Sequence, residues 1–218
     1  MSSLFERLKL DCAEEWRAYT QHDFVTGMGN GSLPEAAFRD YLVQDYLFLI
    51  QFARAYALAV YKGRSLAEMR QALEGLKAIL DVEMDLHVRL CARWGLSSED
   101  LEAAPEKTQT VAYTRFVLDA GQAGDLLDLY VALAPCMIGY AEIGSALAQS
   151  AGETNSYREW IKEYAGEEYQ QLAAATIANL DELASEMMTE RRYPRLKALF
   201  SAATLLEADF WQMGLEAQ

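Results

Sequence analysis

The sequence predicts an all-α protein made of roughly eight helices. Apolar residues recur at intervals of three and four along most of the 218 residues, which is the spacing of amphipathic helices. Several of these stretches run for 20 residues or more, and no alternating β pattern or internal repeat interrupts them. Since 52% of the residues are hydrophobic, the chain can bury a sizeable core, and we expect one helical domain over residues 1–218.

The first helix is expected over residues 3–20, where apolar side chains repeat at helical spacing: Leu4, Leu8, Cys12, Trp16 and Tyr19. A glycine-rich stretch, residues 27–31, follows it. This stretch resembles a phosphate-binding loop only superficially, because no strand precedes it and the G-x-G-x-x-G spacing is absent. We therefore expect a turn that leads into the second helix, with Pro34 at its start.

The second helix is expected over residues 34–61, and its apolar stripe contains an acid. Asp45 lies four residues after Tyr41 and three residues before Phe48, on the face that should meet the core. A carboxylate at such a position must be paired or hydrogen-bonded, because burying it alone is costly. Two interpretations stay open: Asp45 is a structural residue bonded to a neighbouring helix, or it is a functional group.

A long third helix is expected from the capping box at residues 65–68 to about Trp94, where Gly95 ends it. Glu83 and His87 are one turn apart on this helix and could form a metal-binding pair. An ordinary surface or core pair is the more frequent outcome of this spacing, and we favour it here.

The most apolar segment, residues 129–141, contains no charged side chain. As a helix it is about 20 Å long, too short to span a membrane, so we expect it inside a buried central helix over residues 125–150. Pro135 should kink that helix, because it lacks an N–H and clashes with the preceding turn. Cys136 and Tyr140 share a face. Cys136 is then either a small apolar core residue or a thiol to which the kink gives room.

The rest of the chain continues the helical pattern. Residues 96–107 are expected to form a linker, and a helix over residues 108–121 carries Tyr113 near its apolar face. Three more helices are expected over residues 154–165, 167–188 and 194–215. Tyr164 lies on the aromatic face of the first of these. Glu207 interrupts the apolar stripe of the last one, so it is a second carboxyl expected in the core.

Composition and charge exclude several classes of function. The net charge of −14 repels a phosphate backbone, so we expect no nucleic-acid partner. The chain has no basic amphipathic stretch for a membrane surface, and the first residues are acidic where a signal peptide would be apolar, which predicts a cytoplasmic protein. Three cysteines without a C-x-x-C motif predict neither a disulfide framework nor a zinc site.

Three predicted helices thus each carry one reactive group on a buried face: Asp45, Cys136 and Glu207. Aromatic side chains with hydroxyl groups accompany them in the pattern: Tyr113, Tyr140 and Tyr164. A nucleophilic thiol, an acid–base carboxyl and aromatic walls together suggest chemistry on a flat aromatic ligand.

At these residues the chain resembles the TenA/thiaminase II family, in its cysteine-containing branch. The matching segments follow the family's order over nearly the whole chain: His22-Asp23-Phe24-Val25, Gly31-Ser32-Leu33, Phe38 through Gln44-Asp45-Tyr46, Pro135-Cys136 with Tyr140, Tyr157-x-x-Trp160-Ile161-x-x-Tyr164, and Glu207-x-x-Phe210-Trp211. Each segment is weak alone, but the set is specific. The resemblance implies a heme-oxygenase-like helical fold, usually assembled as a homotetramer.

The resemblance further implies an aminopyrimidine aminohydrolase, or thiaminase II, that works in thiamin salvage. Such an enzyme hydrolyses aminopyrimidine breakdown products of thiamin to hydroxymethylpyrimidine and ammonia, and cleavage of thiamin itself into pyrimidine and thiazole is the related activity. By the family pattern, Cys136 is the nucleophile that adds to the ring, and Glu207 donates and accepts protons. Asp45, Tyr140 and Tyr164 hold the pyrimidine, Tyr113 lines the pocket, and neither a metal nor an organic cofactor is needed.

Phe48 departs from the family pattern, which often has a tyrosine at this position that helps to activate the thiol. Phe48 still faces the same pocket as Asp45, because the two are three residues apart on one helix. How Cys136 is activated is therefore the open part of the resemblance.

Two other classes of function stay open. The same fold hosts di-iron oxidases and heme oxygenases, so the fold alone does not decide the function. The chain has only two histidines, which disfavours a di-iron site or a heme with a histidine ligand. The second alternative is a helical protein that binds a pyrimidine without turning it over, and Phe48 gives this alternative some weight.

Overall fold

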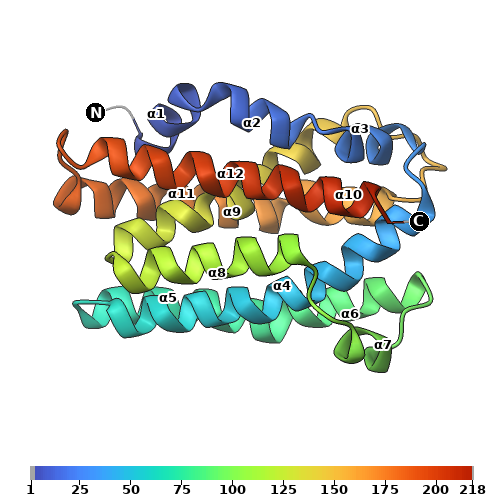
Figure 1. The fold of residues 1–218 in the computed structure, drawn as a ribbon, viewed down its shortest axis with the longest axis horizontal. Coiled ribbons are helices and arrows are strands. Elements are labelled where there is room, and N and C mark those ends of the chain that lie inside the picture. The colour runs from blue at the N-terminus through green and yellow to red at the C-terminus, as the bar shows by residue number, and fades with distance from the viewer. Residues whose placement is uncertain (1–2, 218) are drawn as a thin grey trace.

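The computed structural model describes residues 3–217, with the side chain of Val82 left out, and contains only helices within that range. The elements, drawn in Figure 1, are α1 (Leu4–Asp11), α2 (Ala13–Thr20), α3 (Asp23–Asn30), α4 (Glu35–Lys62), α5 (Leu66–Lys77), the π-helical segment η1 (Ala78–Glu83), α6 (Met84–Arg93), α7 (Ser98–Ala103), α8 (Thr108–Ala123), α9 (Leu126–Ala148), α10 (Arg158–Ala165), α11 (Glu167–Met187) and α12 (Tyr193–Leu215). The predicted all-α class is confirmed.

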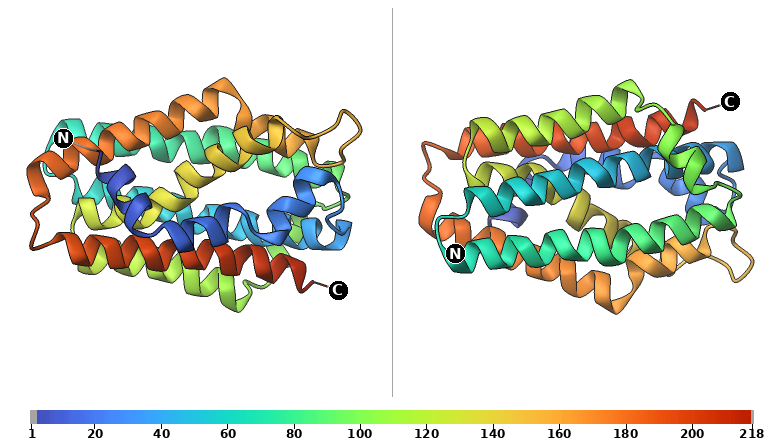
Figure 2. Two further views of the ribbon diagram at one scale, coloured as in Figure 1. Left: turned by 90° about the horizontal axis from the view of Figure 1, so that it is seen from above. Right: turned by 90° about the horizontal axis from the view of Figure 1, so that it is seen from below.

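Helix α9 runs through the middle of the bundle, between α11 and α12, as the left view of Figure 2 shows. It also contacts α4, α8 and α10, so most long helices pack against it. Every residue from 126 to 141 is buried except Cys136, which keeps part of its surface accessible. Among the described helices, only α9 is long and apolar enough to span a membrane by composition, and 89% of its most apolar window is buried inside the bundle. The predicted central helix is therefore confirmed.

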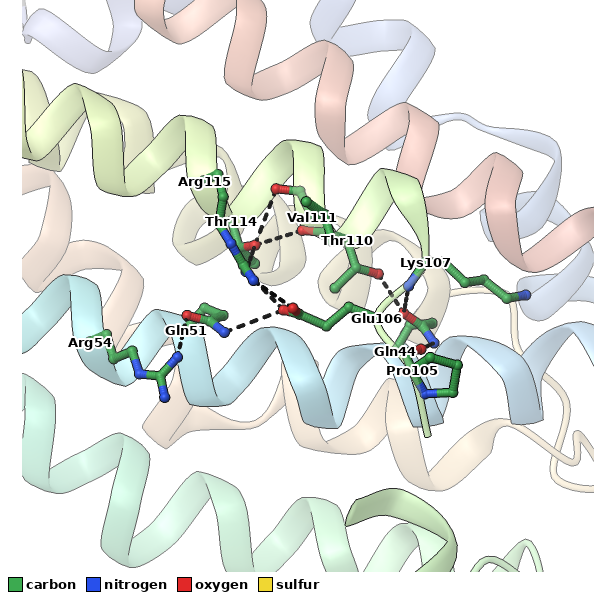
Figure 3. A network of polar contacts seen from close by, with 10 residues as sticks. All are labelled: Gln44, Gln51, Arg54, Pro105, Glu106, Lys107, Thr110, Val111, Thr114 and Arg115. Carbon is green, nitrogen blue, oxygen red and sulfur yellow. Dashed lines mark hydrogen bonds and ion pairs between the residues drawn. The ribbon is translucent and has the colours of Figure 1, made fainter. Parts of the chain in front are cut away.

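The side chain of Gln44 joins α4 to the start of α8 (Figure 3). Its amide Nε2 donates to the carbonyl of Pro105 at 3.0 Å, and its Oε1 accepts from the backbone N–H of Lys107 at 2.9 Å and from the hydroxyl of Thr110 at 2.6 Å. Three hydrogen bonds thus join this amide to one short segment. These bonds fix the register between the two helices that carry Asp45 and Tyr113.

The segment from α5 through η1 to α6 is continuous, and it covers the predicted third helix. Ser65 caps its start by accepting a hydrogen bond from the N–H of Glu68 at 3.1 Å, and Gly95 follows its end with a φ of 73°. The π-helical turn in the middle, Ala78–Glu83, was not predicted. A π-helical turn holds an extra residue and often marks a functional site.

Three details of the chain differ from the sequence prediction. The first helix breaks at Cys12, whose φ of −121° and ψ of 35° separate α1 from α2. The glycine-rich stretch is mostly helical, because it forms the end of α3, and only Gly31 leaves the helix with a φ of 79°. The predicted linker contains α7, which Ser97 and Asp100 cap by reciprocal hydrogen bonds.

Gly27 has a structural role that explains its place in α3. The N–H of Leu33 donates to the carbonyl of Gly27 at 3.0 Å, so the chain folds back tightly onto the helix. A Cβ at position 27 would lie 3.3 Å from the backbone of Leu33. The glycine therefore permits close approach of two backbone segments and does not form a phosphate loop.

Candidate active site

The helix packing brings all the sequence-predicted site residues to one region around α9. Helix α4 supplies Asp45 and Phe48, and the neighbouring helices supply the rest: Tyr113 from α8, Cys136 and Tyr140 from α9, Tyr164 from α10, and Glu207 from α12. Helices α4, α8, α10 and α12 all contact α9, which explains how residues so far apart in the sequence meet.

Glu207 is 1% exposed and is held by a tyrosine. The hydroxyl of Tyr113 donates to Glu207 Oε1 at 2.8 Å. Burial raises the pKa of Glu207 to about 8; this hydrogen bond opposes the shift, and the charge of Asp45 contributes to it. A carboxyl with such a pKa can both donate and accept a proton near neutral pH.

Cys136 lies deep in the bundle, although part of the residue's surface remains accessible. Burial raises its pKa well above the usual value, and three nearby carboxyls add to the effect: Glu207, Glu83 and Asp45. Together these groups disfavour the thiolate in the empty site. A nucleophilic role for Cys136 therefore requires a neighbouring base that takes its proton when substrate is bound.

Asp45 ends a short chain of hydrogen bonds. Trp160 Nε1–H donates to the hydroxyl oxygen of Tyr41 at 3.1 Å, and that hydroxyl donates to Asp45 Oδ2 at 3.2 Å. Burial raises the pKa of Asp45 to about 7, although the bond from Tyr41 acts in the opposite direction. Asp45 is therefore poised to change its charge near neutral pH.

His87 contacts the same carboxyl from α6. Its Nε2 lies 2.8 Å from the carbonyl of Leu42, which can only accept, so Nε2 carries a hydrogen. Its Nδ1 then faces Asp45 Oδ2 at 3.4 Å. Burial lowers the pKa of His87 to about 4, which favours a neutral imidazole beside a protonated Asp45. Glu83, which the sequence places one turn away from His87, is not its partner.

Phe48 is buried among aromatic rings. Its ring centroid lies 5.1 Å from that of Tyr113 and 5.8 Å from that of Phe210. Phe48 thus packs against the tyrosine that holds Glu207, and it supplies no hydrogen bond. The role of Phe48 in the site stays a prediction.

A second group of aromatic rings forms a wall of the site. Tyr164 lies at its centre, with its ring 4.9 Å from that of Tyr140 and 4.4 Å from that of Trp160. The ring of Tyr169 meets Tyr164 edge to face at 4.7 Å and 80°. Such walls suit a flat, apolar-faced ring as ligand.

A cleft of about 790 Å³ leads to this wall from outside, between η1 and α6 on one side and α10 and α11 on the other. Its deep residues include the nearly fully buried Trp160 and His87, and Glu83 and Tyr164 line it too. At the surface, Arg93 of α6 forms an ion pair with Glu159 of α10 across the cleft. The cleft has the size of a small-molecule site.

Within residues 3–217, no three side chains of the metal-ligating types converge in an arrangement that could hold a metal ion. His87 uses its two ring nitrogens on Leu42 and Asp45, so neither is directed to Glu83. The proposed di-iron alternative gains no support from this donor set.

The family model of the TENA/THI-4/PQQC family matches residues 11–217. The chain belongs to this family. The match covers every residue discussed above as part of the site, and the predicted TenA resemblance is confirmed.

Individual TenA-family relatives are similar over nearly the whole chain. An aminopyrimidine aminohydrolase from Halalkalibacterium halodurans is 42% identical over 200 residues, which cover 91% of this chain and 89% of that protein. A solved structure described as a TenA family transcription regulator from Silicibacter sp. TM1040 has a TM-score of 0.93 and 46% identity, covering 98% of this chain and 96% of that one. A Shewanella denitrificans domain described as having a heme oxygenase-like fold has a TM-score of 0.73 at 14% identity, covering 96% and 91%, which confirms the predicted fold type.

Sequence reasoning missed three contributors to this TenA-family site. Tyr41 and Trp160 were treated as core aromatics, although they form the hydrogen-bond chain to Asp45. His87 was considered only with Glu83. The available signal was a histidine four residues from a carboxyl. Its partner on α4 could not be inferred, because that contact depends on how the two helices cross.

Proposed function

We propose that this chain is an aminopyrimidine aminohydrolase of the TenA family, in which Cys136 is the nucleophile. Its substrates are aminopyrimidines that carry an amine on a methylene group, and its products are the hydroxymethylpyrimidine and ammonia. Cleavage of thiamin into its pyrimidine and thiazole halves is the related activity. The observation that carries the proposal is the position of Cys136, a partly accessible residue in the otherwise buried stretch 126–141 of α9, next to the Tyr113–Glu207 pair.

The mechanism follows from the positions of these groups. A neighbouring carboxylate takes the proton of Cys136, the sulfur forms a bond to a ring carbon, and the Glu207 carboxyl donates its proton to the ring nitrogen that gains the electron pair. Those electrons then expel the protonated amine from the methylene carbon as ammonia. Water adds through its oxygen to the methylene carbon and releases a proton to solvent. As the carbon–sulfur bond breaks, the sulfur regains its proton from the carboxyl group that held it, and Glu207 regains its proton from the ring nitrogen.

Binding of the pyrimidine uses the remaining site residues. The rings of Tyr140 and Tyr164 hold one face, with Phe48 and Tyr113 on the side of Glu207. The carboxyl of Asp45 hydrogen-bonds the polar edge of the pyrimidine ring. The charge of this carboxyl depends on its contacts with Tyr41 and His87. No metal or organic cofactor takes part in the proposed reaction.

We further propose that the whole chain acts as one catalytic domain, assembled as a homotetramer in the cytoplasm. Leu66, Leu73 and Leu80 are 68%, 38% and 51% exposed at seven-residue intervals along α5 and η1. Apolar side chains exposed in a row support a contact between subunits. The net charge of −14 opposes binding to nucleic acid, so the regulator described for the Silicibacter protein is the less favoured function here.

The test is incubation of the purified chain with the aminomethylpyrimidine, followed by quantification of both products. We expect ammonia and hydroxymethylpyrimidine in equal amounts, at a rate that a chelator leaves unchanged. Tight binding without product would favour the pyrimidine-binding alternative. Stoichiometric iron in active protein, with activity lost on chelation, would favour the oxidase alternative.

A further inference from the structure

Glu83 is a carboxyl that the proposed mechanism leaves without a task. It ends the π-helical segment η1 and lines the cleft that leads to the site. Within residues 3–217, no group donates a hydrogen bond to it and no cation pairs with it. His87, one turn further along, is held by Leu42 and Asp45 and cannot serve as its partner. A carboxyl in this situation is available to a ligand.

Aromatic rings surround the same part of the cleft. Trp160, Tyr164 and Tyr169 all line it together with Glu83. Trp160 and Tyr164 lie 4.4 Å apart, and Tyr169 meets Tyr164 edge to face, so the rings present faces in different directions. Several aromatic faces beside a carboxylate are a typical arrangement for binding an organic cation.

We propose that Glu83 and the rings of Trp160, Tyr164 and Tyr169 form a subsite for the positively charged group that leaves from the substrate's methylene carbon. The ligand class is an organic cation attached to the pyrimidine, either a primary ammonium or an aromatic cation such as a thiazolium ring. The inference rests on the proposed function, because the pyrimidine must lie between Cys136 and the wall of Tyr164 for its substituent to reach the cleft.

The electrostatics of the cleft agree with this subsite. Burial, with smaller contributions from Asp45 and Glu163, raises the pKa of Glu83 to about 8, so the empty site opposes its ionisation. A bound cation would offset that cost. Arg93, a cation that also lines the cleft, is paired with Glu159 at the surface, and so it does not compete for Glu83.

The test compares the affinities of two ligands that differ in charge. Calorimetric titration measures binding of the cationic aminomethylpyrimidine and of the neutral hydroxymethylpyrimidine, in a Cys136→Ser background that suppresses turnover. The variants are Glu83→Gln, which keeps the shape and removes the charge, and Tyr169→Leu, which removes one ring. Glu182→Gln, an exposed position on α11 outside the cleft, is the matched control.

We expect Glu83→Gln to weaken binding of the aminomethylpyrimidine by about tenfold or more, and binding of the hydroxymethylpyrimidine by less than about twofold. Tyr169→Leu should cause a loss of about fivefold for the cationic ligand alone, and it decides the matter if Glu83→Gln does not fold. Equal losses for the two ligands, or none, would overturn the subsite while leaving the proposed function intact. Failure of the unmutated chain to bind either pyrimidine would overturn both.

Discussion

At the scale of single residues, the carboxyl of Glu207 makes the sharpest prediction. Glu207→Gln keeps the shape and the partner of Tyr113, but removes a proton that must be exchanged during the reaction. General acid–base groups contribute about a hundredfold or more to the rate. We expect kcat to fall by that order with a smaller change in substrate affinity, measured by steady-state kinetics and by titration. Unchanged turnover in a variant that melts earlier would assign Glu207 a structural role only.

Phe48 makes the opposite kind of prediction, a gain of activity. Its ring packs 5.1 Å from Tyr113 and offers no hydrogen bond, while burial and three carboxyls raise the pKa of Cys136. The rate should therefore be low and should rise with pH as the thiol ionises. A hydroxyl at this position could hydrogen-bond the sulfur and favour its charged form.

Phe48→Tyr should increase kcat by about tenfold, since a hydrogen bond to a charged group contributes roughly 1.5–3 kcal/mol. The measurement is a pH–rate profile of both proteins, in which the basic limb of the variant should move to lower pH. If neither the rate nor the limb changes, Phe48 only packs against substrate, and Asp45 activates the thiol unaided.

Residues of this kind differ in how far the sequence reveals them. Asp45 and Glu207 could be found because each interrupts an apolar stripe on its own helix. The contact between His87 and Asp45, and the chain from Trp160 through Tyr41, join helices whose relative placement no local pattern encodes. The sequence suggests Glu83 only as a partner of His87. That Glu83 has no partner depends on how the helices around the cleft pack.

At the scale of elements, Gln44 is the residue that couples α4 to α8. Gln44→Ala removes three hydrogen bonds and leaves the hydroxyl of the fully buried Thr110 without its carbonyl acceptor. We expect the free energy of unfolding to fall by about 2 kcal/mol, measured by urea denaturation. Gln212→Ala, which removes one exposed bond to Glu216, should cost less than about 0.5 kcal/mol. Equal effects of the two variants would contradict the role given to Gln44.

Helix extents were predictable where the periodicity is long, as in α4, α9 and α12, because the apolar stripe and the end residues agree. The failures were local. Cys12 fits the helical stripe on either side of it, so the break between α1 and α2 leaves no sign in the apolar pattern. The glycines of α3 favour a turn by propensity, but tight packing against Leu33 and Leu147 keeps them helical. The π-helical turn has no sequence pattern that we can name.

At the scale of the whole molecule, buried carboxyls should make stability depend on pH. Burial raises the pKa of Glu83 and Glu207 to about 8 and that of Asp45 to about 7, so the folded chain holds protons that the unfolded chain has released. Their favourable contribution is complete in acid and is lost as the pH rises through 7 and 8. The pKa of His87 is lowered from 6.5 to about 4, so this residue makes the free energy of unfolding rise with pH, but only below pH 6.5.

The free energy of unfolding should therefore fall between about pH 6.5 and 8, by on the order of 1 kcal/mol per pH unit for each carboxyl that is still protonated in the folded chain, and it should level off above pH 8. Urea denaturation at several pH values measures this slope. The Glu83→Gln and Glu207→Gln variants should each have a shallower slope than the unmutated chain. Stability that is constant or rises over this range would show that these carboxyls are ionised in the folded protein.

The central claim, that Cys136 carries out the reaction on the pyrimidine, is tested most directly by the rate of ammonia release from the aminomethylpyrimidine. A thiolate is far more nucleophilic than the hydroxyl of a serine. We predict that Cys136→Ser loses nearly all turnover while it still folds and binds the pyrimidine, and that Cys12→Ser and Cys91→Ser release ammonia at the rate of the unmutated chain. Undiminished ammonia release by Cys136→Ser would contradict the covalent mechanism.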